Sequence, residues 1–331
     1  MKKPSPSPVE DWSNYWQTRA QDGERQAGVG EAFLGEGVET DARLADYWRP
    51  FFQTCPDQAS VLDIGCGAGS VLRNAAAAGL ANLTGMDFSA AAIAALSENV
   101  PQATGITGDV TDPPFGEARF DVITSQFGIE YAGLDAFAKI APFLAPGGQL
   151  NMLCHLKGGA IYEEVEGHLQ NIQKIHDTDY LGRAQALVRA NFARRENITG
   201  EASQNAMTLD DAYTKAGEEF VIAKTALTEL IEDGVTGLSE HLFHGFEQLY
   251  ARQQAYLLSD ITDWLAGIGH ELDRYQGRMQ GMQAAALTKA DLELIKQHLA
   301  AAGLDAIDMT EFSLPVDDAP IAWAIRAKRA G

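Results

Sequence analysis

Short apolar runs alternate with helix-like segments along residues 60–155, and this alternation limits the fold more than any other feature. An apolar run at 61–64 ends in glycines, and an alanine-rich helical segment follows over 70–78. The same change of period recurs, with strands expected at 83–87, 105–109, 120–126 and 148–155 and helices at 90–99 and 135–144. Strands and helices that alternate in this way favour a doubly wound α/β fold, with helices on both faces of a parallel sheet.

A long helical segment interrupts this pattern. Apolar residues at 158–287 recur at helical spacing and predict roughly five amphipathic helices. After it, Thr288 and Asp291 predict the start of another helix, Gly303 its end, and two strands are expected at 307–314 and 321–328. We therefore expect one α/β domain, formed by residues 11–157 and 288–331, with a mostly helical insertion at 158–287.

Charge and termini narrow the function classes. The chain has 25 basic and 46 acidic residues, a net charge of −21, which argues against binding to nucleic-acid phosphates or anionic membranes. Residues 1–10 are rich in Pro and Ser and predict a disordered tail without a signal peptide. No run approaches the ~18 apolar residues of a bilayer span. A cytoplasmic protein that binds neither nucleic acid nor membrane is expected.

The cysteines and histidines do not indicate a metal site. Cys55, Cys66 and Cys154 are an odd number of cysteines without metal-ligand spacing, so we expect buried thiols in a reducing compartment. His241 and His244 share a helix face, but no third ligand accompanies them. No bound metal is predicted.

The glycine-rich stretch at 65–69 is the strongest candidate for a ligand site. Glycines between a strand and a helix let the backbone turn tightly and approach a ligand, and the helix N-terminus offers unpaired N–H groups. Asp87 ends the second strand, where a carboxylate can bind the hydroxyls of a ribose, and Phe88 beside it can pack on a purine. A nucleotide-like ligand is therefore predicted.

A dinucleotide is a poor match to this stretch. Ser70 occupies the last position of the dinucleotide fingerprint, where Gly or Ala is required. Asp63, just before the first glycine, would repel a pyrophosphate but attract an ammonium group. These two departures disfavour a nicotinamide or flavin dinucleotide.

Together with the later motifs, these residues resemble the class I S-adenosylmethionine-dependent methyltransferases. The similarity covers about residues 60–150 and 288–330. It rests on the glycine-rich motif at 61–69, on Asp87 and Asp109 at the ends of two strands, on the strand at 120–127 and on the Pro146-Gly147-Gly148 turn. It implies a Rossmann-like sheet of seven strands, parallel apart from a C-terminal antiparallel hairpin.

The resemblance also implies a cofactor and its contacts. S-adenosylmethionine would be the methyl donor and S-adenosylhomocysteine the product, with an N-terminal helix closing over the cofactor. The implied cofactor-binding residues are Trp16, Arg19, Asp63, Gly65, Cys66, Gly67, Asp87, Phe88, Asp109, Val110, Ser125 and Gln126.

Glu130, Tyr131 and His155 follow the fourth and fifth strands and are the candidate catalytic residues. A methyl group on a sulfonium is already reactive, so orientation would supply most of the acceleration, and a general base is needed only if the acceptor must lose a proton. Each candidate also has a structural alternative: a solvated loop acid, a packed tyrosine and a hydrogen-bonded strand end. The Asn/Asp-Pro-Pro-Tyr/Phe signature is absent, which disfavours methylation of nucleic-acid adenine or of glutamine. With the net charge of −21 and the helical insertion after the fifth strand, direct in-line transfer to a small molecule is predicted.

Two other functions stay open at this point. One is a non-catalytic S-adenosylmethionine-binding scaffold. The other is an oxidoreductase with a nucleotide cofactor, which Ser70 and the Pro146-Gly147-Gly148 turn disfavour. The insertion is expected to act as a lid over the acceptor or as a dimerisation arm, so a homodimer is also left open.

Overall fold

A computed structural model describes residues 12, 15–16, 37–198, 206–232, 238–314 and 319–331. The chain divides into two compact units. The first, here called the sheet unit, comprises Met1–Glu166 and Gly277–Gly331, and the second, the helical unit, comprises Gly167–Gln276. The disordered tail expected at 1–10 lies outside the described residues.

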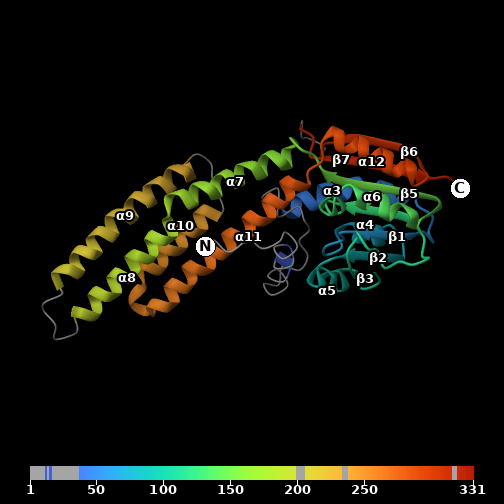
Figure 1. The fold of residues 1–331 in the computed structure, drawn as a ribbon. Coiled ribbons are helices and arrows are strands. Elements are labelled where there is room, and N and C mark those ends of the chain that lie inside the picture. Colours follow the sequence, from blue (N-terminus) through green and yellow to red (C-terminus); the bar gives the residue numbers. More distant parts are fainter. Residues whose placement is uncertain (1–11, 13–14, 17–36, 199–205, 233–237, 315–318) are drawn as a thin grey trace. The chain divides into compact units, whose positions relative to one another are not determined.

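The sheet unit contains a seven-stranded sheet with the order β3-β2-β1-β4-β5-β7-β6 (Figure 1). Strands β1 to β5 are parallel, and β7 is antiparallel to both β5 and β6. The strand bounds are β1 Ser60–Ile64, β2 Asn82–Asp87, β3 Thr104–Thr107, β4 Phe120–Gln126, β5 Leu144–His155, β6 Leu304–Phe312 and β7 Ala322–Arg329. The predicted parallel sheet with a C-terminal antiparallel hairpin is thus confirmed.

The order of the strands reverses beside β1, which pairs with β2 on one side and β4 on the other. In open α/β sheets, ligands bind outside the carboxyl ends of the strands at such a reversal. The helices of this unit are α3 Gly37–Gln53, α4 Ser70–Ala77, α5 Ala90–Asn99, α6 Asp135–Ile140 and α12 Lys289–Ala301, with 3-10 helices η1 Ile129–Ala132 and η2 Ala141–Phe143.

Several expected boundaries in this unit were wrong. Strand β5 begins at Leu144 and not at 148, and β6 ends at Phe312 and not at 314. The helix expected at 135–144 ends at Ile140 and continues as a 3-10 turn, because Pro142 lacks the N–H that an α-helix needs. The strand expected at 105–109 ends at Thr107. Strand β6 begins at Leu304 and not at 307, and an irregularity between Asp305 and Asp308 interrupts its pairing with β7.

Helix α12 has the ends that the sequence predicts. The Thr288 hydroxyl accepts a hydrogen bond from the N–H of Asp291, and the Asp291 carboxylate accepts one from the N–H of Thr288, which forms a capping box. Gly303 follows the helix with φ of +83°, a conformation that glycine adopts without strain. Buried Leu292, Ile295 and Leu299 pack the helix into the core of the sheet unit.

The helical unit has a core of its own. It is built from α8 Tyr180–Ile198, α9 Ala206–Glu232, α10 Leu238–Ala251 and parts of α7 Ala160–Thr178 and α11 Leu258–Ala285, with the 3-10 turn η3 Gln253–Ala255. Its centre is aromatic, with Tyr180, Phe220 and Phe246 in mutual ring contact. The expected number of helices agrees with these five, but α9 begins at Ala206 and not at the expected cap Thr208.

The insertion leaves and rejoins the sheet unit at neighbouring points. Leu156, just after β5, forms a parallel bridge with Leu287, and the indole N–H of Trp323 donates to the carbonyl of Leu287. The helical unit is shorter than the expected insertion at 158–287, because the first turns of α7 and the last turns of α11 belong to the sheet unit. Among the helices that the structure describes, none has the length and apolar character required to cross a membrane.

Candidate functional site

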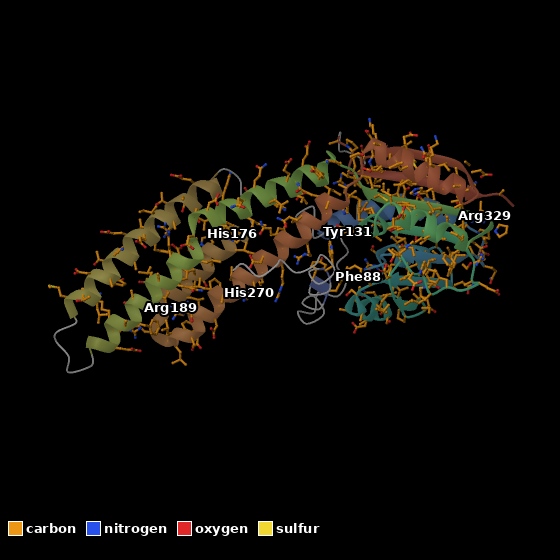
Figure 2. The ribbon with its side chains drawn as sticks, viewed as in Figure 1. Phe88, Tyr131, His176, Arg189, His270 and Arg329 are labelled. Atoms are coloured by element: carbon orange, nitrogen blue, oxygen red, sulfur yellow. The ribbon has the colours of Figure 1, made fainter. Side chains whose placement is uncertain are left out.

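A cavity of about 250 Å³ opens in the sheet unit at the carboxyl ends of β1, β2 and β4. Figure 2 shows two of its residues, Phe88 and Tyr131, at the same edge of the sheet. The described residues that line it are Trp12, Trp16, Ile64, Gly65, Gly67, Met86, Asp87, Phe88, Gly108, Asp109, Val110, Thr111, Phe127, Gly128, Tyr131 and Ala132.

The loop after β1 forms one wall through its backbone. Gly65 has φ of +64°, and a Cβ at this position would lie 2.8 Å from the Cα of Gly128 in the loop after β4. The two loops therefore approach to backbone contact, which a side chain at Gly65 would prevent. The N–H of Cys66 donates to the carbonyl of Met86, and the Cys66 side chain is buried away from the wall.

Trp16 covers the same loop from the N-terminal segment. A Cβ on Gly67 would lie 2.8 Å from Cζ2 of Trp16, so the indole rests directly on the glycine. Trp16 is buried and packs with Ala68 of the glycine-rich loop and with Ala92 and Ala95 of α5. The structure thus places Trp16 beside the predicted ligand loop, whereas its predicted partner Arg19 lies outside the described residues.

Asp87 is held rigidly at the cavity wall. Its carboxylate accepts hydrogen bonds from the backbone N–H groups of Gly67 at 3.0 Å and Ser89 at 2.9 Å. Burial raises the pKa of Asp87 to about 6, although these two hydrogen bonds act in the opposite direction. The second acid, Asp63, is buried behind the wall, where it accepts a hydrogen bond from the Thr124 hydroxyl.

The far end of the cavity is flanked by the loop after β3. Asp109 accepts a hydrogen bond from the N–H of Thr111, which lowers the pKa of this exposed carboxylate. Val110 and Phe88 line the same end, and Phe88 is 39% exposed. The sequence did not predict Gly108 or Thr111 in this wall, although both adjoin the predicted Asp109 and Val110.

Ser125 and Gln126 make internal hydrogen bonds and do not line the cavity. The Ser125 hydroxyl donates to the carbonyl of Ile64 and accepts from the N–H of Ile129. The side-chain amide oxygen Oε1 of Gln126 accepts a hydrogen bond from the indole N–H of Trp48 at 2.6 Å. In this structure both side chains therefore join β4 to neighbouring elements.

Glu130, Tyr131 and His155, the three candidate catalytic residues, lie together. Tyr131 lines the cavity, and its hydroxyl is 3.3 Å from Nε2 of His155. His155 is buried and stacks on the Phe127 ring, with centroids 4.6 Å apart. The Glu130 carboxylate accepts a hydrogen bond from the backbone N–H of His155. Tyr131 is thus the member of this cluster that reaches the cavity.

Burial determines the protonation of this cluster. It lowers the pKa of His155 to about 3, so the imidazole is neutral at pH 7. It raises the pKa of Glu130 to about 7, against the effect of the hydrogen bond from His155. The backbone of Phe127 is strained, with φ of +54°, and this turn directs the chain from β4 past the cavity.

Trp12 completes the wall beside Tyr131 and was not predicted as a site residue. The two rings are nearly perpendicular, at 88°, with centroids 6.0 Å apart. Tyr15 meets Trp12 edge-to-face at 5.5 Å, and the Arg278 guanidinium lies 5.0 Å from the centroid of the Tyr15 ring. The group of aromatic residues at the N-terminus was the one sequence signal that could have identified Trp12.

The structure brings about half of the predicted site residues to one cavity. Trp16, Gly65, Gly67, Asp87, Phe88, Asp109, Val110 and Tyr131 line it. The side chains of Asp63, Cys66, Ser125, Gln126, Glu130 and His155 are buried behind the wall. Within the described part of the chain, no three His, Cys, Asp or Glu side chains are grouped in a way that could hold a metal ion.

The comparison with protein families agrees with this fold. Residues 61–148 match a family described as a methyltransferase domain. A 63-residue segment is 43% identical to an uncharacterized methyltransferase of Synechocystis sp., and it covers 19% of this chain and 29% of that protein. The matched segment thus spans less than a third of the curated relative. The matched residues 61–148 lie in a sheet with the strand order of the class I methyltransferases.

Solved structures give likenesses of lower similarity. The plantazolicin methyltransferase BpumL in complex with SAH aligns at 13% identity over 98% of this chain and 95% of that chain, with a TM-score of 0.47. CalS10 of Micromonospora echinaspora, an amino pentose methyltransferase with SAM bound, aligns at 26% identity over 41% of this chain and 55% of that chain, with a TM-score of 0.29. The assignment of the fold therefore depends on the strand order itself.

Proposed function

We propose that this chain transfers a methyl group from S-adenosylmethionine to a small-molecule acceptor. The observation that carries the proposal is the cavity at which the Gly65–Gly67 loop and the Asp87 carboxylate meet. Its position outside the carboxyl ends of β1 and β2, at the reversal of strand order, supports a nucleoside ligand.

The residues present fit this cofactor. The Asp87 carboxylate is fixed by two backbone N–H groups and keeps lone pairs that can accept from ribose hydroxyls. Phe88 and Val110 offer apolar surface to a purine, and Asp109 can accept from its amino group. A Cβ on Gly67 would meet Trp16, so the glycine allows the indole to pack directly on the loop at the cavity wall.

The charge of the cavity favours this cofactor over a dinucleotide. Asp87 and Asp109 are the charged side chains among the described lining residues, and both are acids. Two phosphates would be repelled there, whereas a positively charged sulfur would be attracted. When bound, S-adenosylmethionine supplies a methyl group on such a sulfur.

The contribution of this chain is positioning and exclusion of water. Trp12, Trp16 and Phe127 cover the cavity with apolar surface, and Tyr131 lines it beside them. A rigid, apolar enclosure of this kind aligns two reactants and limits hydrolysis. Glu130 and His155 act behind Tyr131, as positioning residues that do not reach the cavity.

Calorimetry with S-adenosylhomocysteine tests the cofactor assignment. The wild-type protein is expected to bind it, and Asp87→Asn should weaken binding by about 1.5–3 kcal/mol, the range for hydrogen bonds to a charged group. Asp57→Asn, an exposed acid outside the cavity, is the matched control and should bind normally. Unchanged affinity in Asp87→Asn would remove the ribose assignment.

A turnover assay tests the reaction itself. The protein is incubated with labelled S-adenosylmethionine and a metabolite extract, and products that gain one methyl group in place of hydrogen are sought by mass spectrometry. Label in a small molecule supports the proposal. Cofactor binding without transfer to any metabolite would favour the scaffold alternative.

A further inference from the structure

The end of the cavity beside Tyr131 is an aromatic corner, formed by Trp12 and Tyr131. Their rings meet at 88°, and both line the cavity. Trp12 is only 8% exposed, so its position is determined by packing. The face of an aromatic ring is negative and attracts cations such as ammonium groups, and both residues of this corner line the cavity.

Further contacts stabilise this corner. Tyr15 packs edge-to-face on both Trp12 and Trp16. The guanidinium of Arg278, in the last turns of α11, lies over the Tyr15 ring. Arg278 therefore packs on Tyr15, and Tyr15 in turn packs on Trp12. These contacts hold the corner in place without a ligand.

The charged side chains that line the cavity favour a cation, and the Arg278 guanidinium lies over the Tyr15 ring and is not among the lining residues. The charged groups among the described lining residues are Asp87 and Asp109, and the chain has 46 acidic against 25 basic residues. The field of such a protein raises the local concentration of cations and repels anions. His155, the nearest basic group to Tyr131 that the structure describes in this cluster, carries no charge at pH 7 because burial lowers its pKa to about 3.

We propose that the methyl acceptor is a primary or secondary amine, which the Trp12–Tyr131 corner binds as its ammonium ion. This inference rests on the proposed function and names the class of acceptor for the same site. Carboxylates and phosphates would meet acids and ring faces there, and the corner would exclude them.

The chemistry requires the amine in its free form for transfer. The ammonium ion first releases one proton to water, and the nitrogen lone pair then forms the new N–C bond. The C–S bond breaks and its electron pair stays on sulfur, which becomes a neutral thioether. The product is a methylated ammonium ion, so the same ring faces stabilise the positive charge before and after transfer.

Tyr131 is placed to orient the free amine. When its hydroxyl donates to the unprotonated Nε2 of His155, the phenol oxygen keeps lone pairs that can accept a hydrogen bond. Those lone pairs can accept an N–H of the amine and so direct the nitrogen lone pair away from Tyr131. Tyr131 is then an acceptor-orienting residue and His155 its positioning residue.

Three probes of one shape test this inference by calorimetry on protein saturated with S-adenosylhomocysteine. Benzylamine is positively charged, benzyl alcohol is neutral and benzoate is negatively charged at pH 7. Benzylamine should bind at least tenfold more tightly than benzyl alcohol, and benzoate should give no heat. Equal or tighter binding of benzyl alcohol or benzoate, or no binding of benzylamine, would overturn the proposal.

Variants locate the binding in the corner. Trp12→Leu should weaken benzylamine roughly 2–30-fold, the fold-change that corresponds to a cation–π contact, and benzyl alcohol by less. Trp12→Phe, which keeps a ring, should restore most of the loss. Tyr256→Leu, which changes an aromatic residue outside the cavity, is the control. Equal losses for both probes in Trp12→Leu would show that the corner does not select charge.

The two proposals fail in different ways. If S-adenosylhomocysteine gives no heat, the proposed function fails, and the same three titrations on ligand-free protein then test the corner by itself. If S-adenosylhomocysteine binds but benzylamine does not, the cofactor assignment stands and the amine acceptor is excluded.

Discussion

Glycines have different roles in the two units of this protein. In the sheet unit, Gly65 and Gly128 allow two backbones to touch, and a Cβ on either would approach the other to 3.0 Å or less. In the helical unit, Gly167 and Gly267 lie within helices and have no other atom within 4 Å of an added Cβ. The contact of Gly65 with Gly128 therefore depends on the absence of side chains, whereas Gly167 and Gly267 have space for one.

The cores differ in the same sense. Strands β1 and β4 pack aliphatic side chains from adjacent strands, such as Leu62 and Ile123, both with no exposed surface. The helical unit gathers Tyr180, Phe220 and Phe246 from three separate helices. A sheet fixes its core through hydrogen-bond register, but a helical bundle fixes it through the shapes of side chains.

The largest expected difference between the units comes from adding one methyl group. Gly65→Ala forces a Cβ to 2.8 Å from a backbone atom at a φ of +64°, so it should cost about 1–3 kcal/mol in strain alone and abolish S-adenosylhomocysteine binding. Gly267→Ala should leave binding intact and stabilise the protein by about 0.4–1 kcal/mol. Urea unfolding and calorimetry measure both. Normal affinity in Gly65→Ala would contradict the role of this backbone contact.

Truncations of buried core side chains should next show that each unit loses stability by itself. Leu265→Ala in α11 and Leu62→Ala in β1 each remove a fully buried side chain and should destabilise their own unit by about 2–5 kcal/mol. Hydrogen exchange should accelerate mainly within 167–276 for Leu265→Ala and mainly across β1 to β5 for Leu62→Ala. Equal acceleration across both units in both variants would mean that they unfold as one.

The pH dependence of stability should differ in sign between the units. In the sheet unit, burial raises the pKa of Asp63 to about 7, of Asp87 to about 6 and of Glu130 to about 7. The folded state therefore holds more protons than the unfolded state between about pH 4 and 7, and its free energy of unfolding should fall as the pH rises through this range. His155 and Asp109, whose pKa values are lowered, act oppositely, but burial also raises the pKa of a fourth carboxyl of this unit, Glu164, to about 7.

In the helical unit, burial lowers the pKa of His168, so its contribution to stability is lost as the pH falls below about 6.5, the unfolded value. Hydrogen exchange at pH 5 and 8, corrected for intrinsic rates, should show the sheet unit better protected at pH 5 and the helical unit better protected at pH 8. The double variant Asp63→Asn, Glu130→Gln should flatten the dependence in the sheet unit. An unchanged slope would remove these two carboxyls as its cause.

The smallest expected effect compares two threonines. Thr288→Ala removes the capping box of α12 and should cost about 1 kcal/mol. Thr225→Ala in α9 removes an exposed hydroxyl that bonds only its own helix at Val221, and it should be neutral or slightly stabilising. Thermal unfolding measures both variants, and a larger loss for Thr225→Ala would reverse the comparison.

Sequence reasoning located the sheet unit better than its site. The alternation of strands and helices predicted the parallel sheet, and the motif at Thr288 predicted the start of α12, because both depend on residues adjacent in the chain. Gly65, Gly67 and Asp87, which the sequence predicts at one ligand site for the same reason, line one cavity. Trp12 was missed, because its contact with Tyr131 joins segments far apart in the sequence.

Side-chain direction was the weakest part of the prediction. Ser125 and Gln126 end β4 beside the cavity, but the carbonyl of Ile64 and the indole of Trp48 take up their polar atoms. His155 ends β5, yet it stacks on Phe127 and reaches the cavity only through Tyr131. A motif gives the position of a residue along a strand, whereas its neighbours on adjacent strands decide which atoms it faces.

The sequence by itself determined the order of strands and helices, the tight loop before α4 and the acid at the end of β2, because local periodicity and backbone sterics set these features. Only the tertiary structure decided which aromatic rings stand at a right angle beside Tyr131 and which acids are buried enough to hold a proton near neutral pH. Those properties arise from the distances between segments remote in the chain, and packing and desolvation depend on such distances.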